Sequence, residues 1–298
     1  MTSKNQSKNP NNILILGGGY IGRELFYSLL GEYVVALRQK RELNYYDQNE
    51  LSKFILNNDI SVVINCFGFT GIPNVDEAEI KKNECWDLNV VTPLKIVNTC
   101  NKLGVKYIHI SSGCIYSGYK KVFTENDSPN FGLFDDSSFY SKSKHSFETL
   151  TENNDLKIIR IRMPICYDIK NRRNYLSKIM KYPNLIDMEN SKTFIPDLGG
   201  FIKALINSNI SWTGQDVYNV VNPDPLSTYE VINLLNSGNE GKWDKLDPNW
   251  VLISELDILA PRSNCILDNT KASKIYKFDT ETEYMWRIMN NINGLQAS

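Results

Sequence analysis

Tyr140 and Lys144 are two residues whose types and spacing could do chemistry. They lie four positions apart, which on a helix places both side chains on one face. An ammonium one turn from a phenol favours the phenolate and lowers the pKa of the tyrosine, so the pair predicts a tuned acid. Ser112 precedes them and can offer a second hydroxyl to the same substrate oxygen. Tyrosine and lysine are also common on exposed helix faces, so the pair gains meaning only from the elements that position it.

A glycine-rich turn follows a short apolar run near the start of the chain. Ile13-Leu-Ile-Leu16 predicts a buried strand, Gly17-Gly-Gly-Tyr-Ile-Gly22 a turn, and residues 23–30 a helix. This order is the context of the dinucleotide fingerprint, in which glycines admit a pyrophosphate and the helix N-terminus offers it free N–H groups. An ordinary tight turn is the alternative. The cofactor contacts expected here are Gly17, Gly19, Tyr20, Ile21 and Gly22.

The end of the second strand bears on the choice of cofactor. That strand is expected at residues 33–37, and no acidic residue follows it to bind a ribose 2′-hydroxyl. Arg38, Lys40 and Arg41 follow instead, and a cluster of cations suits a 2′-phosphate. The sequence therefore predicts NADPH at Arg38, with NADH as the alternative cofactor and solvated loop charges as the alternative reading of the cluster.

Alternating strands and helices predict the fold class. Further strands are expected at residues 60–65, 105–110 and 156–161, with helices at 51–57 and 84–103. This alternation is typical of an α/β fold, here a Rossmann-type doubly wound parallel sheet with right-handed crossovers. Ligands of such sheets bind at the carboxyl ends of the strands. Gly17 and residues 66–71 and 111–114 all fall at those ends.

The second half of the chain is less regular. Helices are expected at residues 174–182, 198–207 and 228–235, and short strands at 217–220 and 265–267. We therefore expect a dinucleotide-binding Rossmann domain at residues 13–165. Residues 166–298 are expected to form mainly a smaller, irregular substrate-binding lobe, with some segments returning to the Rossmann core. Residues 1–12 are polar and are expected to be a disordered leader. Asp136 or Ser137 is the expected N-cap of the helix that carries Tyr140.

Composition and charge argue against several classes of protein. The 298 residues are 42% hydrophobic and 22% charged, which is typical of a soluble globular protein. A net charge of −1 gives no argument for nucleic acid or an anionic membrane. No apolar run approaches the roughly 20 residues that span a bilayer. The six cysteines are scattered without a C-x-x-C pair, which argues against a metal site or a disulfide framework and suits a reducing, cytoplasmic compartment.

Several motifs together resemble a known family. The glycine turn, Ser112 and the Y-x-x-x-K pair look like those of the extended short-chain dehydrogenase/reductases. Five segments narrow the match: FTGIPNVD at 69–76, SGCIY at 112–116, YSKSK at 140–144, RIRMPI at 160–165 and APRSN at 260–264. In this order they resemble the bifunctional UDP-4-keto-6-deoxyglucose 3,5-epimerase/4-reductases, over about residues 13–278. One departure is Leu16, which stands where the extended family usually has the first glycine of G-x-x-G-x-x-G.

The resemblance implies a reaction in two stages. UDP-4-keto-6-deoxy-D-glucose would be epimerised at C3 and C5 and then reduced at C4 by NADPH, which gives UDP-L-rhamnose. Both epimerised carbons are α to the ketone, so an acid, a base and donors to the enolate oxygen are needed. The implied donors are Ser112 and Tyr140. The implied acid/base pair is Cys114 and Lys178, whose individual roles stay open; a buried structural cysteine and a solvated helix lysine are the alternatives.

The same resemblance implies the remaining contacts. Lys144 would hold the cofactor ribose and tune Tyr140, and Arg262 would bind the substrate diphosphate unless it is a surface charge. Further implied contacts are Cys66, Phe67, Gly68, Asn89 and Met163 to the cofactor, and Thr70, Asn74, Asp76 and Asn174 to the substrate. A homodimer is implied, without nucleic acid or membrane as a partner. The alternatives are a reductase acting only on a dTDP- or GDP-4-keto-6-deoxy sugar and a non-catalytic NADPH-binding Rossmann regulator.

Overall fold

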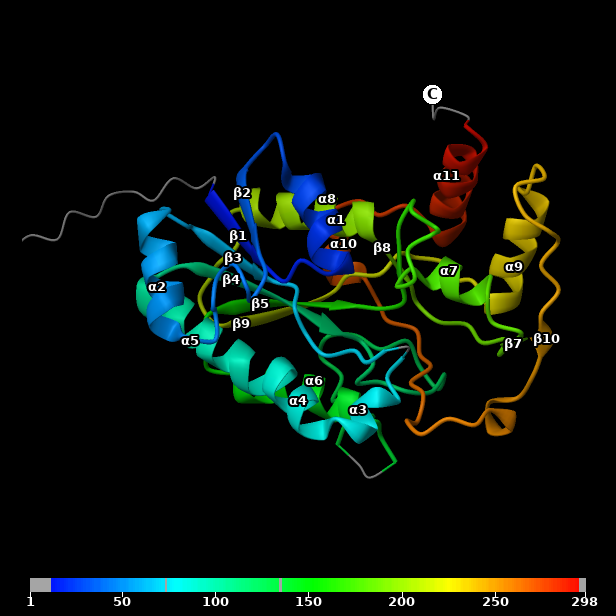
Figure 1. The fold of residues 1–298 in the computed structure, drawn as a ribbon, viewed down its shortest axis with the longest axis horizontal. Coiled ribbons are helices and arrows are strands. Elements are labelled where there is room, and N and C mark those ends of the chain that lie inside the picture. The colour runs from blue at the N-terminus through cyan, green and yellow to red at the C-terminus, as the bar shows by residue number, and fades with distance from the viewer. Residues whose placement is uncertain (1–11, 73, 134–135, 295–298) are drawn as a thin grey trace, which may run out of the picture.

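A six-stranded parallel sheet forms the centre of the molecule (Figure 1). The computed structural model describes residues 12–72, 74–133 and 136–294. Across the sheet the strands are β2 (Val34–Arg38), β1 (Asn12–Leu16), β3 (Val62–Asn65), β4 (Lys106–Ser112), β5 (Leu156–Ile161) and β9 (Gln215–Asn219). The predicted Rossmann-type α/β fold is confirmed. The chain places β2 on one side of β1 and β3 on the other, so the topological switch point, where such sheets bind ligands, lies between β1 and β3.

Helices cover both faces of this sheet because β1 has no polar face. Ile13 and Ile15 point into one hydrophobic core and Leu14 and Leu16 into another, and all four are fully buried. A strand that is apolar on both faces needs cover on both sides. The helices that supply it are α1 (Tyr20–Leu29) and α8 (Ile195–Asn207) on one face, and α2 (Gln48–Asn57), α5 (Thr92–Leu103) and α6 (Phe139–Leu150) on the other.

The helix that contains Asn89 differs from the continuous helix predicted over residues 84–103. It consists of α4 (Lys82–Trp86), a π-helical turn (Asp87–Val91) and α5. Turns of this kind are rare in proteins, and those that occur are frequently found at functional sites. Asn89 is buried in the widened turn, where its side chain has partners outside the helix. Hydrophobic spacing alone does not distinguish such a turn from an ordinary α-helix.

A further hydrophobic core lies beside the sheet, where α7, α9 and α11 are labelled in Figure 1. Leu176, Val231 and Ile288, one from each of these helices, are fully buried in it. Its helices are α7 (Tyr175–Ile179), α9 (Thr228–Ser237) and α11 (Glu281–Asn293), and its strand pairs are β6 (Pro164–Ile165) with β8 (Thr193–Phe194) and β7 (Asn184–Leu185) with β10 (Asn249–Trp250). The remaining short elements are α3 (Glu77–Ile80), η2 (Ile253–Glu255) and α10 (Thr270–Ser273).

Several local predictions in this half were wrong. Residues 265–267 form no strand, since Leu267 makes only an isolated bridge to Phe123. The helix predicted over residues 174–182 is shorter and ends at Ile179. Helix α11 was not predicted, although Thr280 and Glu283 form a capping box at its start. Leu267 and α7 belong to short elements with partners distant in sequence, which a local pattern does not reveal, whereas the capping box of α11 was a local signal.

The N-cap of α6 is Ser138 and not the predicted Asp136 or Ser137. Ser138 Oγ accepts a hydrogen bond from the Ser141 N–H at 3.1 Å. The Ser137 hydroxyl accepts one from the Gly132 N–H at 2.8 Å instead, and Asp136 is exposed. The cap therefore fixes the start of α6 one residue before Tyr140.

Three further findings bear on the predictions. The predicted leader, residues 1–12, lies outside the described residues except for Asn12, which is the first residue of β1. The structure describes all six cysteines as free thiols. Within the described residues, no helix combines the length and the apolar character needed to cross a bilayer.

Candidate active site

The glycine turn between β1 and α1 packs tightly against the end of β3. Gly17 has φ of 100°, a left-handed conformation that favours glycine, and a Cβ added to it would lie 2.6 Å from Phe67 N. A Cβ on Gly22 would lie 1.9 Å from the Gly17 oxygen, whereas one on Gly19 would meet nothing within 4 Å. Gly17 and Gly22 are therefore required by the turn itself. Gly19 leaves its outer side open.

Tyr20 and Ile21 begin α1 directly after this turn. Ile21 packs against the core of the sheet. Tyr20 lies beside Cys166, and burial raises the pKa of its phenol well above the ordinary value. No side chain caps the helix at Gly19, so the first N–H groups of α1 remain available. These N–H groups, rather than the two side chains, are what suits an anionic ligand.

Arg38 and the neighbouring Gln39 flank the glycine turn from the end of β2. The Gly17 N–H donates to the Arg38 oxygen at 2.9 Å. The Arg38 guanidinium lies 5.4 Å from the centre of the Phe54 ring. Gln39 packs against Gly18, where an added Cβ would lie 2.7 Å from its side-chain nitrogen. The Gln39 side chain thus stands next to the turn on the β2 side, whereas Arg38 contacts the turn through its backbone oxygen.

Asn89 joins the loop after β3 to α6. Its Oδ1 accepts the Phe69 N–H at 2.8 Å, and its Nδ2 donates to the Phe69 oxygen at 3.0 Å and to Ser143 Oγ at 2.9 Å. Gly68 allows this approach, since a Cβ on it would lie 2.9 Å from Asn89 Oδ1 and 3.4 Å from Lys144 Nζ. One buried amide therefore sets the position of residues 66–71 relative to Lys144. In the same loop, Phe67 stacks on Tyr45 and the Cys66 N–H donates to the Leu16 oxygen.

Tyr140, Ser112 and Cys114 come together at the end of β4. Tyr140 and Cys114 pack in one hydrophobic cluster. Burial raises the pKa of the Tyr140 phenol well above the ordinary value, and its hydrogen bond with Ser112 lowers it only in part. The Cys114 N–H donates to Ser112 Oγ at 3.2 Å. Three of the predicted catalytic side chains thus lie within one small region.

Lys144 is buried one turn after Tyr140 on α6. It is 4% exposed, and its Nζ lies 6.0 Å from the centre of the Tyr140 ring. Burial lowers the pKa of its ammonium to about 8. The expected lowering of the Tyr140 pKa is therefore wrong for this structure, because the removal of water from the phenol outweighs the nearby charge. Tyr140 keeps its proton at neutral pH and is a proton donor.

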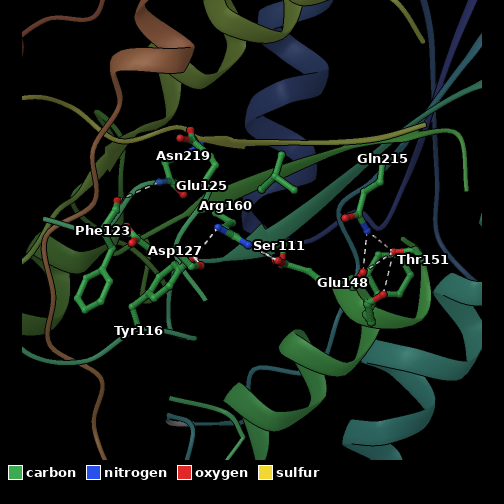
Figure 2. A network of polar contacts seen from close by, with 12 residues as sticks. Ser111, Tyr116, Phe123, Glu125, Asp127, Glu148, Thr151, Arg160, Gln215 and Asn219 are labelled. Atoms are coloured by element: carbon green, nitrogen blue, oxygen red, sulfur yellow. Dashed lines mark hydrogen bonds and ion pairs between the residues drawn. The ribbon is translucent and has the colours of Figure 1, made fainter. Parts of the chain in front are cut away.

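A buried ion pair anchors the helix that carries Tyr140 and Lys144 (Figure 2). Glu148, one turn after Lys144, accepts hydrogen bonds from Arg160 Nη2 and from Ser111 Oγ, each at 2.6 Å. Arg160 Nη1 donates to the Tyr116 hydroxyl at 2.9 Å. Glu148 and Arg160 are 5% and 4% exposed, so the pair is shielded from solvent. The network ties α6 to the ends of β4 and β5.

Arg162, the first residue after β5, directs its guanidinium at Cys114. Its Nη1 lies 3.6 Å from Cys114 Sγ and 2.9 Å from Ser263 Oγ, and its Nη2 lies 2.6 Å from Asn190 Oδ1. Met163 follows with φ of 35°, a left-handed conformation that strains a residue with a side chain. The chain therefore turns sharply at the carboxyl end of β5, next to the other strand ends.

Lys178 lies on α7. Burial lowers the pKa of its ammonium, and Arg173 adds to this effect. Arg173 Nη1 donates to Thr70 Oγ1 at 3.0 Å and to the Gly71 oxygen at 2.8 Å, so the segment before α7 is tied to the loop after β3. Among the described residues, no hydrogen bond or ion pair joins Lys178 to Cys114 or Tyr140.

The other side chains expected at the substrate have partners within the protein. Arg262 and Asp76 bind each other through two hydrogen bonds of 2.7 and 3.0 Å, and this contact lowers the pKa of Asp76. Asn74 Oδ1 accepts the Asp76 N–H at 2.8 Å. Asn174 is fully buried, caps α7 and donates to the Cys166 oxygen at 2.9 Å. Arg262 would bind a diphosphate only by giving up the Asp76 carboxylate. The Asn174 side chain is engaged in capping α7.

The sequence analysis assigned no role to four charged side chains near the site, which are Glu148, Arg160, Arg162 and Arg173. Arg162 was marked only by its place in the segment RIRMPI. Arg160 stands with Lys157 among the apolar residues of the strand LKIIRI, a pattern that indicates buried cations with partners, such as Glu148 for Arg160. Arg173 carries no comparable signal, because it is one of several polar residues in a loop.

Comparisons with known proteins show the family of the chain. A family model described as the RmlD substrate binding domain matches residues 11–282. An Arabidopsis thaliana protein named bifunctional dTDP-4-dehydrorhamnose 3,5-epimerase/dTDP-4-dehydrorhamnose reductase is 35% identical over 225 residues, which cover 71% of this chain and 70% of the relative. The trifunctional UDP-glucose 4,6-dehydratase/UDP-4-keto-6-deoxy-D-glucose 3,5-epimerase/UDP-4-keto-L-rhamnose-reductase RHM3 of the same plant is 32% identical over 72% of this chain and 32% of the relative. The chain thus spans about a third of that longer protein.

Solved structures show the same fold. The L780 UDP-rhamnose synthase from Acanthamoeba polyphaga mimivirus superposes with a TM-score of 0.82 and 26% identity, over 93% of this chain and 98% of that one. The dTDP-4-dehydrorhamnose reductase from Bacillus anthracis, in complex with NADP, has a TM-score of 0.78 and 19% identity over 94% and 99% of the two chains. The resemblance to the 3,5-epimerase/4-reductase group is confirmed by these relatives. The chain belongs to the RmlD substrate binding domain family.

Proposed function

We propose that the protein converts UDP-4-keto-6-deoxy-D-glucose to UDP-L-rhamnose, by epimerisation at C3 and C5 followed by reduction of the C4 ketone. The observation that carries the proposal is the meeting of Tyr140, Ser112 and Cys114 at the end of β4. The epimerase and reductase activities in the names of the Arabidopsis relatives support it. In this proposal residues 13–165 bind the cofactor and residues 166–298 mainly bind the substrate. The homodimer stays a prediction.

The residues around the glycine turn fit NADPH. The open side of the turn at Gly19 and the uncapped start of α1 suit a pyrophosphate. In this proposal Arg38 and Gln39, at the end of β2, would bind the 2′-phosphate, and Lys144 would hold the ribose of the nicotinamide half. When bound, the reduced nicotinamide supplies the hydride for C4. The NADP complex of the Bacillus anthracis reductase supports this choice of cofactor.

Epimerisation uses the two hydroxyls and the acid/base pair. Tyr140 and Ser112 donate hydrogen bonds to the C4 oxygen, which stabilises the negative charge that develops there when a proton leaves C3 or C5. Cys114 and Lys178 take the proton from one face and return one to the other, in an order that the proposal leaves open. Burial lowers the pKa of Lys178, so more of its amine is neutral near physiological pH and able to accept a proton.

Reduction uses Tyr140 as the acid. Its raised pKa means that the phenol keeps its proton until the C4 alkoxide, a stronger base, forms beside it. Lys144, whose pKa is lowered to about 8, remains largely protonated at pH 7 and stabilises the phenolate that is left. The Glu148–Arg160 ion pair keeps both side chains in position through α6.

A dTDP-4-keto-6-deoxy sugar is the second candidate substrate, because the relative with 35% identity is named for dTDP-4-dehydrorhamnose. The test is to incubate the full chain with NADPH and either nucleotide sugar and to identify the products by mass spectrometry. We expect UDP-rhamnose from the UDP sugar. NADPH consumption only after a separate 3,5-epimerase is added would support a reductase alone. No NADPH consumption with either sugar would overturn the proposal.

A further inference from the structure

Arg162 is a buried cation that has no carboxylate partner in the described part of the chain. It is 2% exposed, and the groups that accept its hydrogen bonds are Cys114 Sγ, Asn190 Oδ1 and both the hydroxyl and the backbone oxygen of Ser263. Its Nε has no partner among the described residues. Arg160, two residues earlier, is equally buried but is neutralised by Glu148. Because an uncompensated buried charge costs free energy, Arg162 indicates that an anion forms beside it.

The backbone next to Cys114 packs closely against the Arg162 side chain. Gly113 lies between Ser112 and Cys114, and a Cβ added to it would lie 2.4 Å from Leu267 Cδ1 and 3.0 Å from both Cγ and Cδ of Arg162. A side chain at position 113 would therefore clash with Leu267 and crowd the aliphatic part of Arg162. The Ser263 hydroxyl, in turn, donates a hydrogen bond to the backbone oxygen of Tyr116 at 2.5 Å, which fixes one of the groups that hold Arg162.

We propose that Arg162 is a positioning residue for the epimerisation steps, which holds the Cys114 sulfur at the substrate and stabilises its thiolate. The inference rests on the proposed function, in which Cys114 exchanges a proton with C3 or C5. When Cys114 gives its proton to the carbon, the S–H bond breaks, a C–H bond forms and the electron pair stays on sulfur as a thiolate. In the reverse step the thiolate takes the proton back. Arg162 keeps its own protons throughout and supplies charge and direction only.

Other titratable groups also face Cys114. They are Tyr140 and Lys144 on α6 and Cys265 in the C-terminal segment, while Tyr119 faces Arg162 itself. Tyr140 and Cys265 are neutral when protonated. In contrast to these groups, Arg162 donates a hydrogen bond to the Cys114 sulfur in the described part of the chain. It is therefore the group whose removal should change the thiolate most.

The test follows the alkylation of Cys114 by iodoacetamide as a function of pH, in the full chain, with peptide mass spectrometry to separate it from the other cysteines. The variants are Arg162→Met, which removes the charge, and Arg162→Lys, which keeps a charge but not the fork of donors. Arg287→Met, at an exposed arginine on α11, is the matched control. We expect the pH midpoint of alkylation to rise by about 1 to 3 pH units in Arg162→Met, by less in Arg162→Lys, and not in Arg287→Met.

Deuterium exchange at C3 and C5 of the 4-keto sugar is measured on the same proteins. We expect its pH profile to move in the same order. An unchanged alkylation midpoint in a folded Arg162→Met protein would overturn the inference while leaving the proposed function intact. If Arg162→Met does not fold, an unchanged midpoint in Arg162→Lys has the same meaning. Absence of exchange in the unmodified protein would instead remove the proposed function and the role of Arg162 in it, even if the alkylation midpoints differ.

Discussion

Arg160 on β5 binds Glu148 on α6 through both Nε and Nη2, in a site where each side chain is about 95% buried. Ser111 at the end of β4 adds a hydrogen bond of 2.6 Å to the same carboxylate. Glu148 lies one turn beyond Lys144, so the ion pair determines where Tyr140 and Lys144 stand relative to the strand ends. The active-site helix is therefore held by charge as well as by apolar packing.

Replacing Glu148 by Ala should destabilise the fold strongly. Arg160 would be left as a buried charge without a counterion, which typically costs about 3–5 kcal/mol. Glu32→Ala is the matched control, because the Glu32–Lys203 pair has a similar distance of 2.7 Å but Glu32 is 54% exposed. The control should lose less than about 1 kcal/mol. Urea unfolding measures both values; equal losses would show that the buried pair does not anchor α6.

Asn89→Ala should weaken both stability and cofactor binding. The substitution leaves the Phe69 N–H and oxygen without their partner, which should cost about 2 kcal/mol or more. The loop that follows β3 would also lose its link to α6, so we expect NADPH to bind roughly tenfold more weakly, a difference of about 1.4 kcal/mol. Fluorescence titration with NADPH measures this. Asn98→Ala, at an exposed asparagine on α5, should change neither quantity, and a wild-type affinity in Asn89→Ala would contradict the account.

The pH dependence of stability should report the burial of Lys144. Its pKa is about 8 in the folded chain and 10.5 as the reference value, so the folded state binds fewer protons than the unfolded state between these two values. The cost of burying the ammonium is therefore fully present below pH 8 and is relieved as the pH rises toward 10.5. Lys144→Met removes the ammonium, so below pH 8 the variant should be more stable than the unmodified chain. This difference in the free energy of unfolding should shrink by about 2–3 kcal/mol across that range. Urea unfolding at several pH values tests this, with exposed Lys53→Met as the control; a gain that does not change with pH would be inconsistent with a buried charge.

Tyr140→Phe should abolish the reduction while leaving the fold intact. The phenyl ring fills the same space but has no proton for the C4 alkoxide, so we expect the rate of NADPH oxidation to fall by about 10²- to 10⁴-fold. Absorbance of NADPH in the presence of the 4-keto sugar measures the rate. Tyr27→Phe, at a tyrosine that is 70% exposed on α1, should keep the full rate. A Tyr140→Phe protein with near-normal turnover would assign the proton to another group.

The sheet and the turn could be predicted from the sequence because their signals are local. The run Ile13-Leu-Ile-Leu16, the glycines after it and the strand at residues 156–161 each determine their own structure, and the carboxyl ends of parallel strands necessarily meet. The place of Ser112 and Cys114 at a strand end followed from that rule, whereas Tyr140, on a helix, was expected beside them from its motif and the family resemblance. The raised pKa of Tyr140 did not, because it depends on how completely the folded chain excludes water from the phenol.

The contacts between distant segments could not be predicted in the same way. Arg262 and Asp76 were each assigned to the substrate from their motifs, yet they are 186 positions apart and bind each other. The π-helical turn at Asn89 depends on Phe69 and Ser143, which belong to a loop and to another helix. Such pairings are set by the tertiary structure, whereas spacing along the chain reports only what neighbours on one helix or strand share.

Isotope exchange tests the central claim, that the residues at the end of β4 act on the carbons next to the ketone, most directly. The unmodified chain and Cys114→Ala are incubated with UDP-4-keto-6-deoxyglucose in D₂O, and mass spectrometry and NMR locate the deuterium. The account predicts deuterium at C3 and C5 with the unmodified chain and its loss with a folded Cys114→Ala protein. No incorporation by the unmodified chain, or the same rate in the variant, would contradict it.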